Sequence, residues 1–228
     1  MSAQYNLPRI ASIDVPLKIG VLISGSGSGL EALLRFQQSN NCSHTTAVVI
    51  SDKANVKGLE RATNYGIKSL AITLPPLRYF SSPTERRIAH ENLISKSLDE
   101  HQVELVVCSG YMRILTENFL NQRLGRVINI HPSPWGEDGA LYPGAHGIQD
   151  TIEAGSLVAG ASVHFVSAGV DDGPLIATKT TEILTGEDEQ SLGLRIRIDI
   201  EHKLYPLVID ALAEGRVLQD GNNFKIID

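Results

Sequence analysis

Five short apolar segments, rich in Val, Ile and Leu, alternate along the first half of the chain with stretches whose apolar side chains have helical spacing. Strands that are apolar on both faces belong to parallel sheets covered by helices, so this alternation constrains the fold strongly. The strand segments are residues 17–23, 47–50, 68–72, 105–108 and 126–130. The helical patterns cover residues 30–38, 56–65, 83–100 and 116–122. Right-handed βαβ crossovers then predict an α/β fold: an open, doubly wound, mostly parallel sheet with helices on both faces.

The second half continues the same unit without a linker. Two further strands are predicted at residues 161–166 and 175–184, then a long helical pattern at 187–214 and a C-terminal β-hairpin around Asp220-Gly221. We therefore expect one Rossmann-like domain at residues 17–228.

Two segments do not fit regular elements. Residues 1–16 form an N-terminal extension that we expect to be loosely ordered. Residues 134–147 contain four glycines and the only tryptophan, and are too irregular for a helix or strand. A connection of this length is predicted to be a mobile loop beside a binding site.

Charge and cysteine content exclude several partners. The formal net charge of −6 gives no general attraction to nucleic acid or to an anionic membrane, and neither is an expected partner. No segment reaches the roughly 18 apolar residues that a membrane helix needs, and the N-terminus lacks a signal-type apolar segment. Cys42 and Cys108 have neither disulfide-framework nor metal-ligand spacing. The expected location is cytoplasmic.

The first predicted strand ends in Ser24-Gly25-Ser26-Gly27-Ser28-Gly29 and runs into a helix. Glycines at such a position let backbone N–H groups approach a phosphate at the positive end of the helix. The alternative is a plain tight turn between strand and helix. The segment lacks the lysine of a P-loop and the spacing of a dinucleotide fingerprint, which favours a phosphorylated metabolite over NAD.

Asn129 and His131 stand at the end of the fifth predicted strand, where alternation places both side chains on one side. An amide donor and an imidazole suit acyl transfer to an amine, because one stabilises an oxyanion and the other moves a proton. Asp171, in Asp171-Asp172-Gly173-Pro174, could hold the imidazole, although that tetrapeptide is also ordinary turn chemistry. His164 is interpreted as a structural strand histidine.

Four other histidines are expected at the surface: His44, His90, His101 and His202. None has a carboxylate at metal-binding spacing, so no metal site is expected.

Taken in order, five motifs closely resemble the phosphoribosylglycinamide formyltransferase family. They are I-S-G-S-G-S at 23–28, G-Y-M-R-I-L at 110–115, N-I-H-P-S at 129–133, S-V-H-F-V at 162–166 and D-D-G-P at 171–174. The likeness runs from Leu17 to about Arg216 and includes S-D-K-A at 51–54 and Glu201-His202. Five ordered motifs are far more specific than a glycine loop alone.

The resemblance implies transfer of a formyl group from 10-formyltetrahydrofolate to the amino group of glycinamide ribonucleotide, a step of purine synthesis. It implies that Asn129, His131 and Asp171 are catalytic, that the folate is a co-substrate, and that no metal or prosthetic group takes part. The expected partners are these small molecules, and the chain is expected to be a monomer or a homodimer.

The resemblance also assigns two binding regions, with the ribonucleotide on the N-terminal half and the folate on the C-terminal half. On the ribonucleotide side, the family's phosphate and glycinamide contacts fall on Gly27, Ser28, Gly29 and Glu201. On the folate side, they fall on Arg86, Met112, Arg113, Ile114, Leu115, Asn129, Ser167, Ala168, Gly169 and Val170.

Three departures from the family pattern concern the acceptor. Gly29 stands where the family usually has Asn, Ile198 replaces a usual Gln, and the loop at residues 134–141 is longer by about four residues. Two alternatives therefore remain at this point. One is a formyltransferase that acts on another amine, such as an amino-sugar nucleotide, and the other is a non-catalytic nucleotide-binding module.

Overall fold

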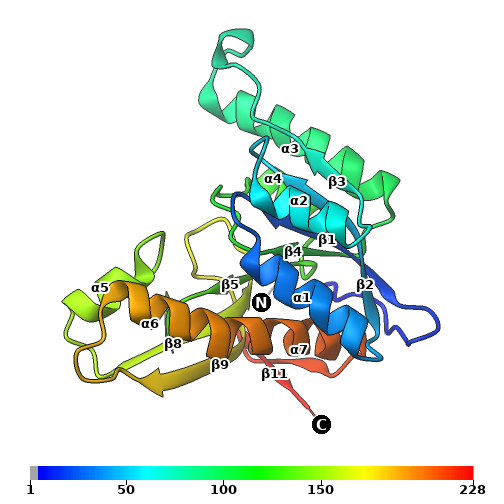
Figure 1. The fold of residues 1–228 in the computed structure, drawn as a ribbon. Helices are drawn as coiled ribbons and strands as arrows, with labels where there is room; N and C mark the ends of the chain where they lie inside the picture. Colours follow the sequence, from blue (N-terminus) through cyan, green and yellow to red (C-terminus); the bar gives the residue numbers. More distant parts are fainter. Residues whose placement is uncertain (1–4, 228) are drawn as a thin grey trace.

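The computed structural model describes residues 5–227. Seven strands form one sheet in the spatial order β3-β2-β1-β4-β5-β8-β9 (Figure 1). Their bounds are β1 (Leu17–Ile23), β2 (His44–Ser51), β3 (Ser69–Ala71), β4 (Leu105–Cys108), β5 (Val127–His131), β8 (Val158–Phe165) and β9 (Leu175–Glu182). The first five run parallel, whereas β8 pairs antiparallel with β5 and β9. The predicted mostly parallel sheet is confirmed, as is the C-terminal hairpin of β10 (Val217–Asp220) and β11 (Asn223–Ile226).

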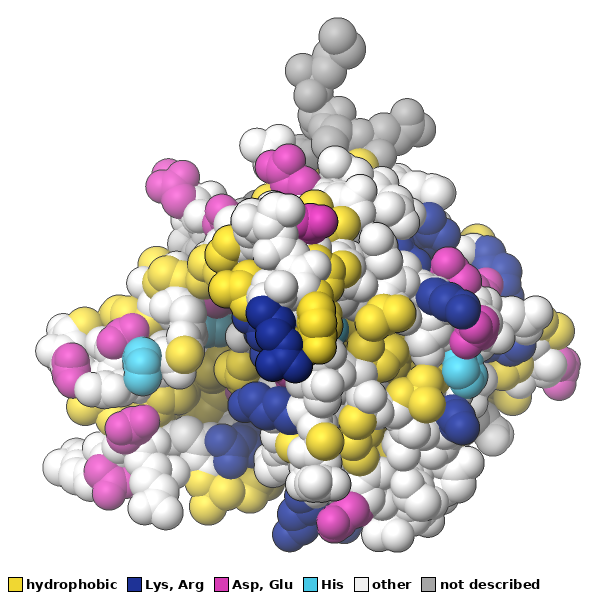
Figure 2. All heavy atoms as spheres, turned by 90° about the horizontal axis from the view of Figure 1, so that it is seen from above, with side chains coloured by type: hydrophobic (Ala, Val, Ile, Leu, Met, Phe, Trp, Pro, Cys, Tyr) yellow, Lys and Arg dark blue, Asp and Glu magenta, His cyan; other side chains and the backbone are white. Residues whose placement is uncertain are grey.

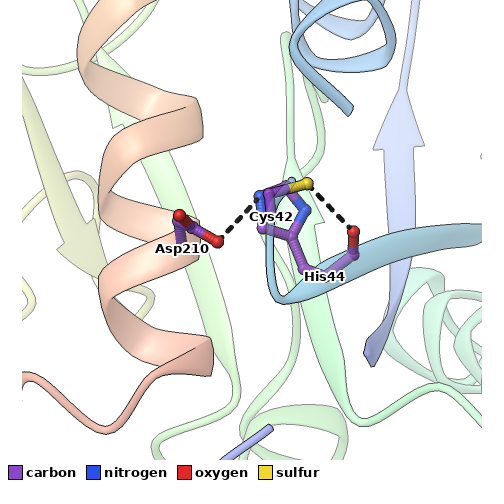
Figure 3. Close-up of side chains that lie close together, drawn as sticks. All are labelled: Cys42, His44 and Asp210. Carbon is purple, nitrogen blue, oxygen red and sulfur yellow. Dashed lines mark hydrogen bonds and ion pairs between the residues drawn. The ribbon is translucent and has the colours of Figure 1, made fainter. Parts of the chain in front are cut away.

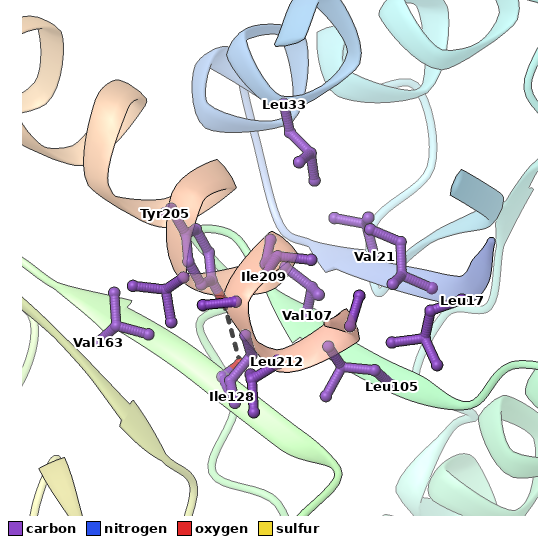
Figure 4. Close-up of a cluster of buried hydrophobic side chains, with 14 of the residues drawn as sticks. Leu17, Val21, Leu33, Leu105, Val107, Ile128, Val163, Tyr205, Ile209 and Leu212 are labelled. Atoms are coloured by element: carbon purple, nitrogen blue, oxygen red, sulfur yellow. Dashed lines mark hydrogen bonds between the residues drawn. The ribbon is translucent and has the colours of Figure 1, made fainter. Parts of the chain in front are cut away.

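Helices cover both faces of the sheet. They are α1 (Ser28–Ser39), α2 (Lys57–Asn64), the 3-10 turn η1 (Leu77–Tyr79), α3 (Pro83–Glu100), α4 (Glu117–Asn121), α5 (Gly147–Glu153), α6 (Glu189–Ile196), the π-helical turn η2 (Arg197–Glu201) and α7 (His202–Ala213). Alternate side chains of β1 point into different cores. Val21 packs in the core with Leu33 of α1 and Ile209 of α7 (Figure 4), while Leu22 packs with Ile94 of α3 on the opposite face.

The N-terminal extension is not loosely ordered over the residues that the structure describes. The Tyr5 ring packs against Phe165 and Phe224, with centroid distances of 5.3 and 5.2 Å. The Ala11 N–H donates to the Ala213 carbonyl at 2.7 Å. Tyr5, Leu7 and Ala11 therefore pack against the core, contrary to the expectation, although the apolar side chains at 10, 13 and 15 are exposed. Residues 1–4 lie outside the described part.

The helical pattern at 187–214 is three elements in succession, α6, η2 and α7, instead of one uniform α-helix. Apolar periodicity does not distinguish a five-residue π turn from α-helix, and π turns often occur at functional sites. The expected irregular loop also contains structure. It begins with a two-rung hairpin of β6 (Trp135–Gly136) and β7 (Gly139–Ala140) and ends at the start of α5.

Within residues 5–227, no helix is both long enough and apolar enough to cross a bilayer. On the face in Figure 2, basic side chains lie among hydrophobic and acidic ones and do not form one continuous basic surface.

Candidate active site

Asp171 is the centre of a polar cluster beside the end of β5. Asn129 Nδ2 donates to Asp171 Oδ1 at 3.3 Å, and His131 Nδ1 lies 3.3 Å from Oδ2. The Gly144 N–H also donates to Oδ2, at 2.9 Å. The structure therefore brings together the three residues that the sequence suggested for catalysis.

The surroundings of Asp171 favour its ionised form. Burial alone would raise the pKa of its carboxyl group, but the hydrogen bond with His164, the charge of His131 and the Gly144 N–H together lower it. The backbone of Asp171 is left-handed, with φ of 50°, a conformation that Asp tolerates better than most residues. The alternative interpretation of residues 171–174 was an ordinary turn. The turn is present, and it also directs the Asp171 carboxylate toward Asn129 and His131.

Both ring nitrogens of His131 face acceptors. Nε2 lies 2.7 Å from the carbonyl of Tyr142, while Nδ1 faces the Asp171 carboxylate. Both nitrogens can donate at once only when the ring is protonated. The chain segment around Tyr142 therefore covers the nitrogen that points away from Asp171.

His164 belongs to the same cluster, which the sequence interpretation missed. It lies opposite Asn129 in the β5–β8 pair, and its Nε2 is 3.5 Å from Asp171 Oδ1. Its Nδ1 is 2.9 Å from the Phe165 carbonyl, and Trp135 of the β6–β7 hairpin packs on the ring at 4.8 Å. The signal that identifies His164 is strand pairing, because an antiparallel partner of β5 must place a residue opposite Asn129.

A cavity of about 960 Å³ lies beyond the carboxyl end of β1 and is lined by the glycine loop. Gly27 precedes α1 with φ of 69°, and no side chain caps this end of the helix. The first N–H groups of α1, from Ser28 and Gly29, are thus available to an anion. Gly29 fits because a Cβ there would lie 2.7 Å from Ser109 Oγ, and Ser109 lines the same cavity.

Glu201 lines this cavity from the opposite part of the chain, at the end of η2. Burial raises the pKa of its carboxyl group to about 7, against an opposing influence of Arg197. The structure thus places Glu201 and the glycine loop around one space. Ile198 is half exposed and is not among the lining residues.

A second cavity, of about 330 Å³, contains the Asp171 cluster. Most of the expected folate-side residues line it: Met112, Arg113, Ile114, Leu115, Asn129, Ser167, Gly169 and Val170. Ala168 is exposed and does not line it. The Arg113 guanidinium is oriented by the buried Asp52, with Nε 2.6 Å from Oδ2, which gives the S-D-K-A motif a structural role.

Arg86 does not line this second cavity. Its Nε donates to the carbonyl of Pro75 at 2.6 Å. The next residue, Arg87, donates instead to the carbonyl of Ile114, a wall residue of the cavity. Helical periodicity alone could not decide which of the two adjacent arginines faces the site.

The two cavities adjoin, because Gly110, Met112, Ile130 and Ala145 line both. An open α/β sheet whose strand ends carry an anion-binding loop, an Asn-His-Asp cluster and two adjoining cavities defines a two-substrate group-transfer enzyme. The chain belongs to the formyl transferase family, whose sequence model, described as formyl transferase, matches residues 17–209.

Known proteins similar to this chain include the phosphoribosylglycinamide formyltransferase of Escherichia coli strain K12. It is 35% identical over 206 residues, which cover 90% of this chain and 92% of the relative. A trifunctional purine biosynthetic protein, adenosine-3, of Drosophila melanogaster is 38% identical over 88% of this chain, but the match covers only 14% of that longer protein. The crystal structure of glycinamide ribonucleotide transformylase 1 from Symbiobacterium toebii superposes with a TM-score of 0.83 and 37% identity, covering 93% of this chain and 95% of that one.

Proposed function

We propose that this enzyme transfers the formyl group of 10-formyltetrahydrofolate to the amino group of glycinamide ribonucleotide, as a single domain at residues 17–228 in the cytoplasm. The observation that carries the proposal is the position of the Asn129-His131-Asp171 cluster in the smaller cavity, on both sides of Ile130, which lines both cavities. Family membership and the names of the similar proteins support the same reaction.

The ribonucleotide occupies the larger cavity. Its phosphate accepts hydrogen bonds from the backbone of Gly27, Ser28 and Gly29 at the positive end of α1. Glu201 faces the same space and binds the glycinamide end. This arrangement points the amine toward the shared wall of the two cavities.

The folate occupies the smaller cavity, between the 112–115 segment and the 167–170 segment. The amine nitrogen attacks the formyl carbon, and the Asn129 amide donates to the oxyanion that forms. The bond between the formyl carbon and N10 of the folate then breaks. The proton lost by the amine passes to N10, with His131 or a water held beside it as the carrier.

Asp171 orients His131 and balances the charge of a protonated ring. The contact of His131 Nε2 with the Tyr142 carbonyl must open if that nitrogen is to reach the formyl oxygen directly. We expect no metal in the reaction, since the three side chains supply the oxyanion and proton-transfer functions.

A steady-state assay with 10-formyltetrahydrofolate tests the proposal, with glycinamide ribonucleotide, an amino-sugar nucleotide, or no acceptor. Folate product that forms only with glycinamide ribonucleotide supports it. Product that forms only with the amino sugar, or without any acceptor, contradicts it in favour of another formyl transfer or of hydrolysis.

The His131→Ala variant separates an enzyme from a binding module. We expect turnover to fall by roughly 10²–10⁴-fold with little change in folate affinity. A loss below tenfold contradicts a catalytic role for His131.

A further inference from the structure

Cys42, His44 and Asp210 form a cluster that the proposed reaction does not use (Figure 3). Cys42 lies in the loop before β2, His44 is the first residue of that strand, and Asp210 comes from α7. One potential ligand atom from each residue lies within 4.8 Å of the others, and His44 Nε2 is 4.0 Å from Asp210 Oδ1. The cluster lies at the amino end of β2, whereas the glycine loop follows the carboxyl end of the parallel strand β1.

His44 is buried, contrary to the surface position expected from the sequence, and His90 is buried as well. The His44 Nε2 atom is enclosed and has no hydrogen-bond partner within residues 5–227. The Pro206 carbonyl approaches the ring, but no atom of the described residues reaches Nε2 with hydrogen-bond geometry. A buried polar nitrogen without a partner is costly, and here it belongs to a cluster with a thiol and a carboxylate.

The two neighbours of His44 are held in place by backbone groups. Cys42 Sγ lies 3.4 Å from the His44 carbonyl, and Asp210 Oδ1 accepts the Ser43 N–H at 2.8 Å. A divalent cation between the three side chains gives Nε2 a partner.

We propose that Cys42 Sγ, His44 Nε2 and the Asp210 carboxylate bind one Zn²⁺ ion, with water as the fourth ligand. Thiolate, imidazole and carboxylate are all zinc ligands, and the Cys42 proton is released to solvent on binding. Zinc–ligand bonds of about 2.0–2.3 Å place tetrahedral ligand atoms roughly 3.3–3.7 Å apart. Ligand atoms that lie up to 4.8 Å apart must therefore approach one another by as much as about 1 Å when the ion binds. Cys42 and Asp210 are partly exposed, which leaves the ion a route to the site.

Gln37 of α1 completes the arrangement behind the ring, since its amide lies 2.8 Å from His44 Nδ1. Binding through Nε2 requires Nδ1 to carry the proton and donate it to the Gln37 oxygen. A flip of the Gln37 amide places its oxygen at His44 Nδ1 and its nitrogen at the Thr46 hydroxyl, which can accept a hydrogen bond. The ion would thereby join α1, β2 and α7, and we assign it a structural role.

Cobalt titration of the full, untagged, metal-stripped protein tests this site. We expect one equivalent of Co²⁺ to give a thiolate charge-transfer band, and Zn²⁺ to displace it and raise the Tm. Cys42→Ser abolishes the band, and Gln37→Leu weakens binding by about 10–100-fold. Cys108→Ala is the matched control and keeps the band, since Cys108 is the other cysteine and is buried in a separate core.

A wild-type protein without a charge-transfer band overturns the proposal, whether or not the variants fold. Equal zinc affinity in wild type and Asp210→Asn also overturns it, because the carboxylate is one of three ligands. Binding that persists in Cys42→Ser with the same spectrum points to adventitious sites and has the same consequence.

Discussion

Asn129 and His164 lie directly opposite each other in the antiparallel pair β5–β8, with Asn129 Nδ2 and His164 Nε2 3.4 Å apart. Both side chains turn toward Asp171, which approaches them from the loop after β8. The carboxylate therefore has an amide and two imidazoles around it, and the properties of the cluster depend on His164 as well as on the three expected residues.

We expect His164→Phe to raise the pKa of Asp171, because a hydrogen bond that lowers it is lost. If ionised Asp171 is the active form, the acid limb of the kcat/KM profile moves to higher pH. Losing a hydrogen bond to a charged group costs about 1.5–3 kcal/mol of stability. His101→Phe, in which the altered ring lies outside the cluster, is the control and leaves the limb in place.

The same shift has a consequence for acid stability. Since the folded pKa of Asp171 is below its unfolded value, its ionised form stabilises the fold above the unfolded pKa, and this stabilisation is lost as pH falls through the folded pKa. We expect His164→Phe to unfold at higher pH on acidification. An unchanged acid limb together with an unchanged unfolding midpoint contradicts the role of His164.

Glu201 makes the opposite contribution. Its pKa is raised from 4.5 to about 7, so its effect favours the fold below pH 4.5 and is lost as pH rises through 7. We therefore expect the free energy of unfolding of Glu201→Gln, relative to that of wild type, to increase by on the order of 3 kcal/mol when the pH is raised from 4.5 to 8. Urea unfolding at the two pH values measures this difference. The substitution also weakens ribonucleotide binding. Asp199→Asn, an exposed neighbour on the same turn, shows neither effect.

The architecture was predictable because apolar segments and helical periodicity report burial directly. The helical pattern predicted at residues 83–100 is α3, and its first turn is stabilised by the Ser82 hydroxyl, which accepts the Glu85 N–H. The clustering of Asn129 and His131 follows from strand alternation. These features depend on neighbours in sequence, and local patterns contain that information.

The features that were missed depend on contacts between distant segments. His164 enters the site through its pairing with β5, and His44 is buried because α7 packs over it. Trp135 lies in a loop that no periodicity describes, yet it packs on His164. Neither register nor long-range packing is encoded in local spacing, so the sequence identified the centre of the site better than its surroundings.

Gly29 and Ser109 form a pair that can be tested by a double-mutant cycle. Gly29→Ala places a Cβ 2.7 Å from Ser109 Oγ, and overpacking of about 1–3 kcal/mol is expected to raise the KM for glycinamide ribonucleotide roughly tenfold. Ser109→Ala in the same chain relieves the contact and recovers most of the loss. Ser109→Ala alone, which adds no atom to the contact, is the control for the cycle. Additive effects in the double variant contradict a direct contact.

Tyr205 connects β4 to β5, the strand that contains Asn129 and His131. Its buried hydroxyl lies 2.9 Å from the Cys108 carbonyl on β4 and 3.1 Å from the Ile128 carbonyl on β5 (Figure 4). Tyr205→Phe leaves both carbonyls without this partner. We expect it to lower the free energy of unfolding, measured in urea, by about 1–3 kcal/mol. Tyr65→Phe removes an exposed hydroxyl that contacts Arg35, and should cost no more than about 0.5 kcal/mol.

The same substitution separates stability from positioning. Asn129 follows Ile128 directly, so a weaker connection between β4 and β5 moves the Asn129 amide that we assign to the oxyanion. We therefore expect kcat to fall while the KM for the folate changes little. Measuring both constants at a temperature where the variant is fully folded isolates this effect. If kcat is unchanged while stability falls as expected, Tyr205 contributes only to stability. The position of Asn129 is then maintained by the pairing of β5 with β8.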